Sequence, residues 1–142
     1  MVKQISIFLE NKCGRLVKVT QVLGTYDINI RALTIADTSD FGILRLIVDK
    51  PEEALEVLKK EGFMASPTEV IAVEVPDTPG GLARVLEYLE EADINIEYLY
   101  SFVEKPDQDA LILMRVEDSG KAMEILKANR VKIIDGPTIY NL

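Results

Sequence analysis

The segment Asp27-Ile28-Asn29-Ile30 recurs unchanged 66 residues later as Asp93-Ile94-Asn95-Ile96. Around it, the 29 positions from Ile5 to Leu33 share ten identities with the positions 66 further along the chain. Unrelated sequences of average composition would share roughly two. The chain is therefore a tandem of two similar units.

The repeat continues to the end of each unit with one small insertion. After Leu33 the offset becomes 68, so that Leu58-Lys59 matches Leu126-Lys127. The two extra residues are expected in a loop around Lys105-Pro106, where an insertion costs little. We place the two domains at residues 1–68 and 69–142, with the boundary near Ser66-Pro67-Thr68.

Both units show the same order of hydrophobic patterns, alternating for strands and at helical spacing for helices. In the first unit the expected elements are a strand at 5–9, a helix over 16–23, strands at 28–36 and 43–48, a helix from Pro51 ended by Gly62, and a short strand at 63–65. In the second they are a strand at 70–75, a helix at 80–91, strands at 94–103 and 110–116, a helix at 121–128, and a last strand that begins at 131–134 with Ile139-Tyr140 near its end.

This order is the βαββαβ split unit of ferredoxin-like α+β folds, a four-stranded antiparallel sheet with both helices on one face. A unit of this size buries only about 60% of its unfolded surface, and its sheet has edge strands with unpaired backbone groups. We therefore expect two tandem ferredoxin-like units packed as a pseudo-twofold pair.

Composition excludes several classes of function. The 142 residues contain no histidine, which removes the commonest general base and the commonest zinc ligand. The net charge of −8 opposes binding to a phosphate backbone. One cysteine, Cys13, allows neither an internal disulfide nor a thiolate metal cluster. Since there is also no apolar run long enough for a membrane span or a secretory signal, we expect a cytoplasmic protein with no metal, cofactor, membrane or nucleic-acid partner.

The most informative segment is Pro76-Asp77-Thr78-Pro79-Gly80-Gly81-Leu82, which lies between a strand and a helix. Its glycines allow a ligand to approach the backbone. The N–H groups that open the next helix have no partner within that helix and suit a carboxylate. The first copy of this turn reads Glu10-Asn11-Lys12-Cys13-Gly14-Arg15-Leu16.

The second shared feature is an asparagine at the start of the second strand of each unit, Asn29 and Asn95. A side-chain amide both donates and accepts hydrogen bonds, so it could bind an α-carboxylate and an α-ammonium together. Asp77 or Asn11 would add an acceptor for the ammonium.

The pattern Asp77-x-Pro79-Gly80-x-Leu82 followed by Ile94-Asn95-Ile96 resembles the ACT domain, a small regulatory module found in amino-acid biosynthetic enzymes. The resemblance covers nearly the whole chain in two copies and is closest to small stand-alone tandem ACT proteins that carry no catalytic domain. The first copy departs from the pattern by having Asn11, Cys13 and Arg15 in place of aspartate, proline and glycine. Arg15 could therefore clamp an acidic group or fill the first site.

The resemblance implies a non-catalytic sensor that binds an amino acid at the interface of the paired ACT units. It further implies a regulated enzyme or other protein as partner, and a homodimer. The ligand-binding positions carried over are Asn11, Gly14, Arg15, Leu16 and Asn29 in the first unit, and Asp77, Gly80, Gly81, Leu82 and Asn95 in the second.

Other interpretations stay open. The glycines and asparagines are also routine turn residues, so the chain could be a structural assembly module that never binds a small molecule. An enzyme is disfavoured because no nucleophile–base pair or metal cluster is visible in the sequence.

Overall fold

The computed structural model describes residues 1–37, 40–102 and 109–142. The loop expected around Lys105-Pro106, and the end of the strand expected to reach Val103, lie outside these residues. The chain divides into two compact units. The N-terminal unit comprises Lys3–Thr68 and Pro137–Leu142, and the C-terminal unit comprises Met1–Val2 and Glu69–Gly136.

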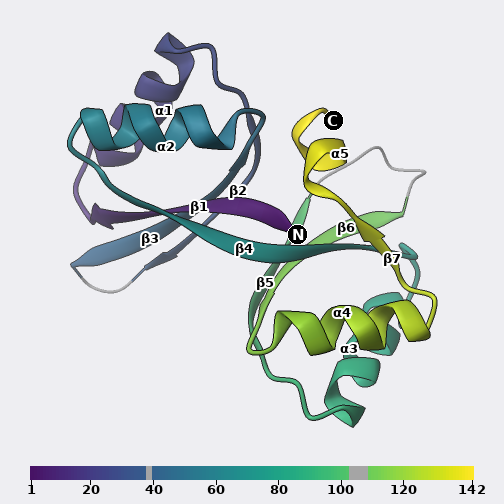
Figure 1. Cartoon of the computed structure of the whole chain (residues 1–142). Coiled ribbons are helices and arrows are strands. Elements are labelled where there is room, and N and C mark those ends of the chain that lie inside the picture. Colours follow the sequence, from purple (N-terminus) through teal and green to yellow (C-terminus); the bar gives the residue numbers. More distant parts are fainter. Residues whose placement is uncertain (38–39, 103–108) are drawn as a thin grey trace. The chain divides into compact units, whose positions relative to one another are not determined.

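Each unit has the predicted βαββαβ order (Figure 1). The elements of the first repeat are β1 (Val2–Glu10), α1 (Arg15–Thr25), β2 (Ile30–Asp37), β3 (Phe41–Val48), α2 (Pro51–Lys60) and the start of β4 (Met64–Val75). The second repeat continues with the rest of β4, α3 (Gly81–Glu91), β5 (Ile96–Phe102), β6 (Ala110–Val116), α4 (Ser119–Ala128) and β7 (Lys132–Ile134), after which the chain ends with the short helix α5 (Gly136–Tyr140).

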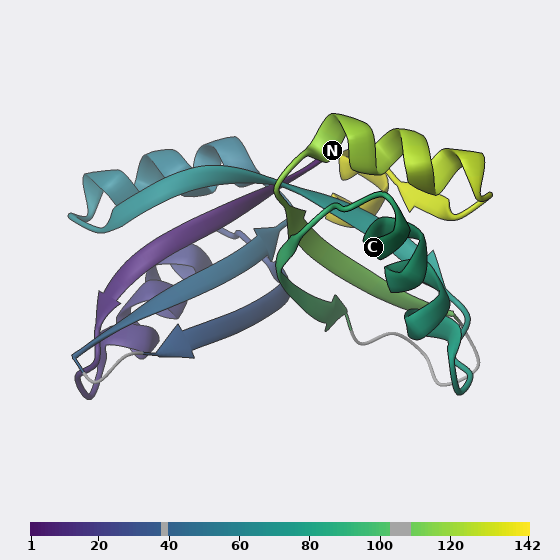
Figure 2. The same cartoon turned by 90° about the horizontal axis from the view of Figure 1, so that it is seen from below.

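The sheets are antiparallel and have the expected topology. In the N-terminal unit β3 pairs with both β1 and β2, and in the C-terminal unit β6 pairs with both β4 and β5 while β7 pairs with β4. In each unit the two long helices lie on one face of the sheet (Figures 1 and 2). The α+β fold class is therefore confirmed.

Equivalent positions of the two repeats fill the same places in two separate cores. Leu23 on α1 and Leu89 on α3 are both buried, as are Leu58 on α2 and Leu126 on α4. Because deleting a buried leucine side chain costs several kcal/mol, these shared positions preserve the fold in both copies and explain part of the repeat.

Local sequence explains where the helices begin and end. Pro51 occupies the first turn of α2, where its missing N–H costs nothing. Glu52 and Glu53 lie in the first turn and Lys59 and Lys60 in the last, which suits the helix dipole. α4 begins at an N-cap, because the Asp118 carboxylate accepts a hydrogen bond from the backbone N–H of Lys121 at 3.1 Å.

The predicted break between the repeats does not occur in the backbone. A short strand at 63–65 and a separate strand at 70–75 were expected, but β4 runs without interruption from Met64 to Val75. It is the last strand of the first repeat and the first strand of the second. Pro67 lies within this strand, and proline is tolerated in a strand where its position requires no ladder N–H.

The last strand begins within the predicted residues 131–134 as β7, but it does not continue to Ile139-Tyr140. After β7 the chain turns into α5, and Pro137 fits the start of this helix as Pro51 does in α2. Ile139 is fully buried, and the Tyr140 hydroxyl accepts a hydrogen bond from the backbone N–H of Lys3 at 2.7 Å. The Arg31 side chain donates to the Tyr140 carbonyl at 3.2 Å. The last residues therefore complete the N-terminal unit.

Candidate functional site

The two strand–helix turns have the same backbone conformation despite different side chains. Gly14 precedes α1 with φ 90°, and Gly80 precedes α3 with φ 84°. This left-handed region strongly favours glycine. No heavy atom lies within 4 Å of the place where a Cβ would stand at either position, among the residues described. Both glycines therefore serve the turn and leave its backbone open to a ligand.

The second turn is tighter than the first. The N–H of Gly81 donates to the Thr78 carbonyl at 3.0 Å, while in the first turn the N–H of Arg15 donates to the Lys12 carbonyl at 3.3 Å. A Cβ on Gly81 would come within 2.2 Å of the Pro76 carbonyl oxygen. The C-terminal turn therefore requires its second glycine for packing, whereas the first turn accommodates an arginine.

Arg15 is already engaged by an acid of its own turn. Its guanidinium donates to Glu10 at 3.3 Å, and the Lys12 ammonium lies 2.9 Å from the same carboxylate. The hydrogen bond from Lys12, together with the charges of Lys12 and Arg15, lowers the pKa of Glu10 below its ordinary value. The structure places Arg15 in an ion pair with Glu10 at the mouth of the turn.

We predict that the interactions of ionised Glu10 with Lys12 and Arg15 stabilise the N-terminal turn, and that this stabilisation is lost in acid. A carboxyl whose pKa is lowered on folding stabilises the fold above its unfolded pKa, and this contribution is lost as the pH falls through the folded pKa. In a carbon-detected NMR titration Glu10 should therefore ionise below its ordinary range. The Lys12→Met variant should raise its midpoint, and an unchanged midpoint in that variant would contradict the assignment.

Asn29 and Asn95 occupy equivalent positions just before β2 and β5. Their backbone carbonyls accept from the N–H groups of Asp49 at 3.1 Å and Glu117 at 3.0 Å. Both side chains are exposed. No side-chain partner for either amide is found within residues 1–37, 40–102 and 109–142, so both amides remain available to a ligand.

Each unit separates its asparagine from its own glycine turn. Gly14 precedes α1 and Asn29 follows it, and the 11 residues of α1 span about 16 Å. The same holds for Gly80 and Asn95 on either side of α3. A small ligand in contact with one turn therefore does not reach the asparagine of the same unit.

Each turn borders a pocket, and the two pockets are related by the repeat. The N-terminal pocket, of about 500 Å³, includes Arg15 and Lys18 with the loop after α2. The C-terminal pocket, of about 380 Å³, includes Gly81 and Arg84, which are the repeat equivalents of these two residues, with the loop after α4. Equivalent positions thus line a pocket in both repeats although their side chains differ. The sequence alone did not predict these pockets.

The pockets contain only some of the predicted site residues. Gly80 and Gly81 line the C-terminal pocket and Arg15 lines the N-terminal one. The other predicted positions belong to neither lining: Asn11, Gly14, Leu16, Asn29, Asp77, Leu82 and Asn95.

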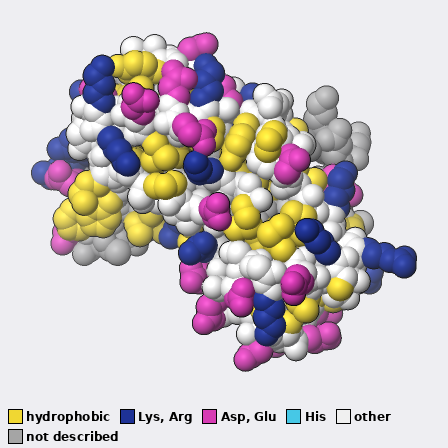
Figure 3. Space-filling model, viewed as in Figure 1, with side chains coloured by type: hydrophobic (Ala, Val, Ile, Leu, Met, Phe, Trp, Pro, Cys, Tyr) yellow, Lys and Arg dark blue, Asp and Glu magenta, His cyan; other side chains and the backbone are white. Residues whose placement is uncertain are grey.

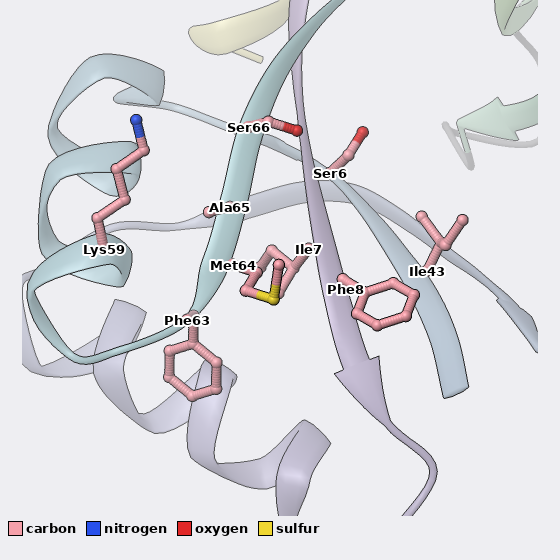
Figure 4. Close-up of a pocket in the computed structure, with 9 residues that line it drawn as sticks. All are labelled: Ser6, Ile7, Phe8, Ile43, Lys59, Phe63, Met64, Ala65 and Ser66. Atoms are coloured by element: carbon pink, nitrogen blue, oxygen red, sulfur yellow. The ribbon is translucent and has the colours of Figure 1, made fainter. Parts of the chain in front are cut away.

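A third, more apolar cavity of about 690 Å³ lies in the N-terminal unit along β1 and the start of β4. In Figure 4 Met64 reaches from β4 toward β1, and Phe8 and Ile43 lie on the neighbouring strands β1 and β3. Phe8 also stacks on Phe41 with ring centroids 4.8 Å apart. Hydrophobic side chains gather at this end of β1 and β3 (Figure 3). Alternation in the first strand predicted Phe8 on the face opposite the core, but one strand alone could not reveal a cavity.

No group of three or more acidic or cysteine side chains is placed to hold a metal ion in the part of the chain that the structure describes. Among the same residues, none of the helices has the length and apolar character that crossing a bilayer requires.

The fold and the duplicated glycine turns define a pair of βαββαβ modules, and the family comparison agrees. The chain belongs to the ACT domain pair family, whose model matches residues 1–142. No curated protein matches the sequence.

Solved structures give the same result. The chain is similar to protein BT0572 from Bacteroides thetaiotaomicron, with 42% identity and a TM-score of 0.94 over 99% of this chain and 96% of that one. It also resembles the ligand-free regulatory subunit of aspartate kinase from Thermus thermophilus, with 18% identity and a TM-score of 0.64 over 89% and 91% of the two chains. The regulatory subunit of aspartate kinase from Thermus flavus is comparable, at 18% identity and a TM-score of 0.62 over 89% and 88%. At this identity the last two show a shared fold.

Proposed function

We propose that this protein is a non-catalytic regulatory protein that binds an amino acid through its glycine turns and the asparagines before β2 and β5. The observation that carries the proposal is the duplicated pair of exposed main-chain turns and unpartnered amides in an ACT domain pair. Turn N–H groups suit the α-carboxylate, and an asparagine amide can serve carboxylate and ammonium together. Asp77 would accept from the ammonium.

The ligand is proposed to lie where a turn of one unit meets an asparagine of another. The support is the length of α1 and α3, about 16 Å, which keeps each asparagine from the turn of its own unit. The resemblance to paired ACT units suggests the same arrangement. Leu16 and Leu82, which follow the turns, would contact the side chain of the ligand.

A regulatory protein of this kind needs a partner that reads its state. We propose a regulated enzyme or other protein in the cytoplasm as this partner, and a homodimer as the assembly.

Support for the homodimer comes from β2, the last strand in the sheet order, whose outer edge pairs with no strand among the described residues. Leu33 and Ile35 on β2 are 51% and 49% exposed. Exposed apolar side chains on an edge strand favour assembly, which also supports the alternative of an assembly module without a small-molecule ligand.

Thermal unfolding in the presence of each of the twenty amino acids tests the proposal. At 100 times its dissociation constant the ligand should add about 2.7 kcal/mol to the free energy of unfolding. Asn95→Ala and Asn29→Ala should each reduce the stabilisation by the amino acid, because each removes the amide of one repeat. Gln21→Ala, which removes an exposed amide on α1 outside both pockets, serves as the matched control. No stabilisation by any amino acid at millimolar concentration would favour the assembly module.

A further inference from the structure

The pocket of the C-terminal unit contains an arginine in the left-handed backbone conformation that follows helix α4. Arg130 follows α4 with φ 60°, in the left-handed region that is unfavourable for a residue with a Cβ. Gly62, which stands at the equivalent position of the first repeat, has φ 88°. The first copy thus uses the residue that suits this conformation, and the second places a guanidinium there instead.

Arg130 shares its pocket with a second unpaired arginine. Arg84, on the second turn of α3, lines the same cavity. Neither guanidinium has an ion-pair or hydrogen-bond partner among the residues that the structure describes. Exposed positive charges of this kind are available to a ligand.

The equivalent pocket of the N-terminal unit neutralises its arginine internally. There Glu10 holds Arg15 at 3.3 Å, but the repeat equivalent of Glu10 is Pro76, which carries no charge. The second copy has therefore lost the acid and gained Arg130 in place of Gly62.

Among the residues that the structure describes, the lining of the C-terminal pocket has more cations than carboxylates, in a protein of net charge −8. Its cations are Arg84, Arg130 and Lys132, and its carboxylates are Glu74 and Asp109. Lys132 lies 3.2 Å from Glu74, so this pair cancels. Among the described residues of the lining, Asp109 is then the one carboxylate left beside the two arginines, and the Tyr88 hydroxyl can donate a further hydrogen bond.

We propose that this pocket binds a small dianion, a phosphate monoester or a dicarboxylate, between Arg84 and Arg130. A planar guanidinium matches the oxygens of either group in a bidentate fashion. The pocket, of about 380 Å³, is within the size range of small-molecule sites. Neither arginine belongs to the turns or the asparagines assigned to amino-acid binding, but Gly80 and Gly81 of the second turn line the same pocket.

Isothermal titration calorimetry with inorganic phosphate and with succinate, at constant ionic strength set by sodium chloride, tests the proposal on the full chain. Binding of phosphate alone identifies a phosphate monoester site, and binding of succinate alone identifies a dicarboxylate site. Arg84→Gln and Arg130→Gly should each weaken the affinity roughly tenfold. Arg130→Gly reproduces Gly62 of the other unit, so a loss of folding is not expected.

The matched control is Lys18→Gln, because Lys18 is the equivalent of Arg84 in the N-terminal pocket. It should leave the affinity for the dianion unchanged. No heat of binding with either anion at millimolar concentration would overturn the proposal, as would equal affinities in the wild type, Arg84→Gln and Arg130→Gly.

Discussion

Replacing Gly81 by alanine is expected to lower the free energy of unfolding by about 3 kcal/mol, which corresponds to a drop in Tm of roughly 6–12 °C. The added Cβ would stand 2.2 Å from the backbone oxygen of Pro76. A carbonyl oxygen cannot swing aside as the end of a flexible side chain can, so either the turn or the start of α3 must move. Differential scanning calorimetry of the variant measures this loss.

Two other glycines provide controls for Gly81→Ala. Gly80→Ala meets no atom within 4 Å but keeps φ 84°, so it should cost about 1 kcal/mol through backbone strain alone. Gly120→Ala lies in helix α4, where the nearest atom is 3.8 Å from the new Cβ, and it should be neutral or slightly stabilising. Equal stability of the Gly81→Ala and Gly120→Ala variants would contradict the close approach at Pro76.

Truncation of either repeat-related core leucine should cost about 3–4 kcal/mol. Leu23 on α1 is 1% exposed and Leu89 on α3 is fully buried, each in the core of its own unit. Because the two cores are separate clusters, Leu89→Ala should weaken mainly the C-terminal unit and Leu23→Ala mainly the N-terminal unit.

Hydrogen exchange followed by mass spectrometry separates these two effects. In Leu89→Ala, exchange should accelerate chiefly in peptides from α3, β5 and β6, and in Leu23→Ala chiefly in peptides from α1, β2 and β3. Uniform acceleration over the whole chain in both variants would show that the units unfold as one.

The repeat made the fold predictable from sequence. Two copies of one hydrophobic pattern gave the order and type of the regular elements, because strand alternation and helical spacing reflect burial on one face. The failures lie where the copies differ. Separate strands were expected at 63–65 and 70–75, but the continuity of β4 depends on pairing partners far away in sequence. Ile139 and Tyr140 read as the end of a strand, but the burial of Ile139 and the hydrogen bond from Lys3 depend on residues of the N-terminal unit that are distant in sequence.

The candidate site was predicted in its parts but not in its geometry. The sequence identified Gly14 and Gly80, whose positive φ explains why glycine stands there. It could not show that glycine is required at position 81 by the nearby Pro76 carbonyl and at position 80 by a positive φ. It also missed Arg84 and Arg130. They line one pocket because α3 and the loop after α4 lie close together in the folded unit. The only sequence signal for Arg130 was that it replaces Gly62 of the first copy.

The central claim is that an amino acid contacts the exposed backbone of the glycine turns. The most direct test is a two-dimensional ¹H–¹⁵N NMR titration of the full chain with each of the twenty amino acids. The account predicts that at least one of them shifts the amide signals of Gly80 and Gly81, or of Gly14, together with the side-chain amide of Asn95 or Asn29. Amide signals of both turns that stay fixed through all twenty titrations would contradict it.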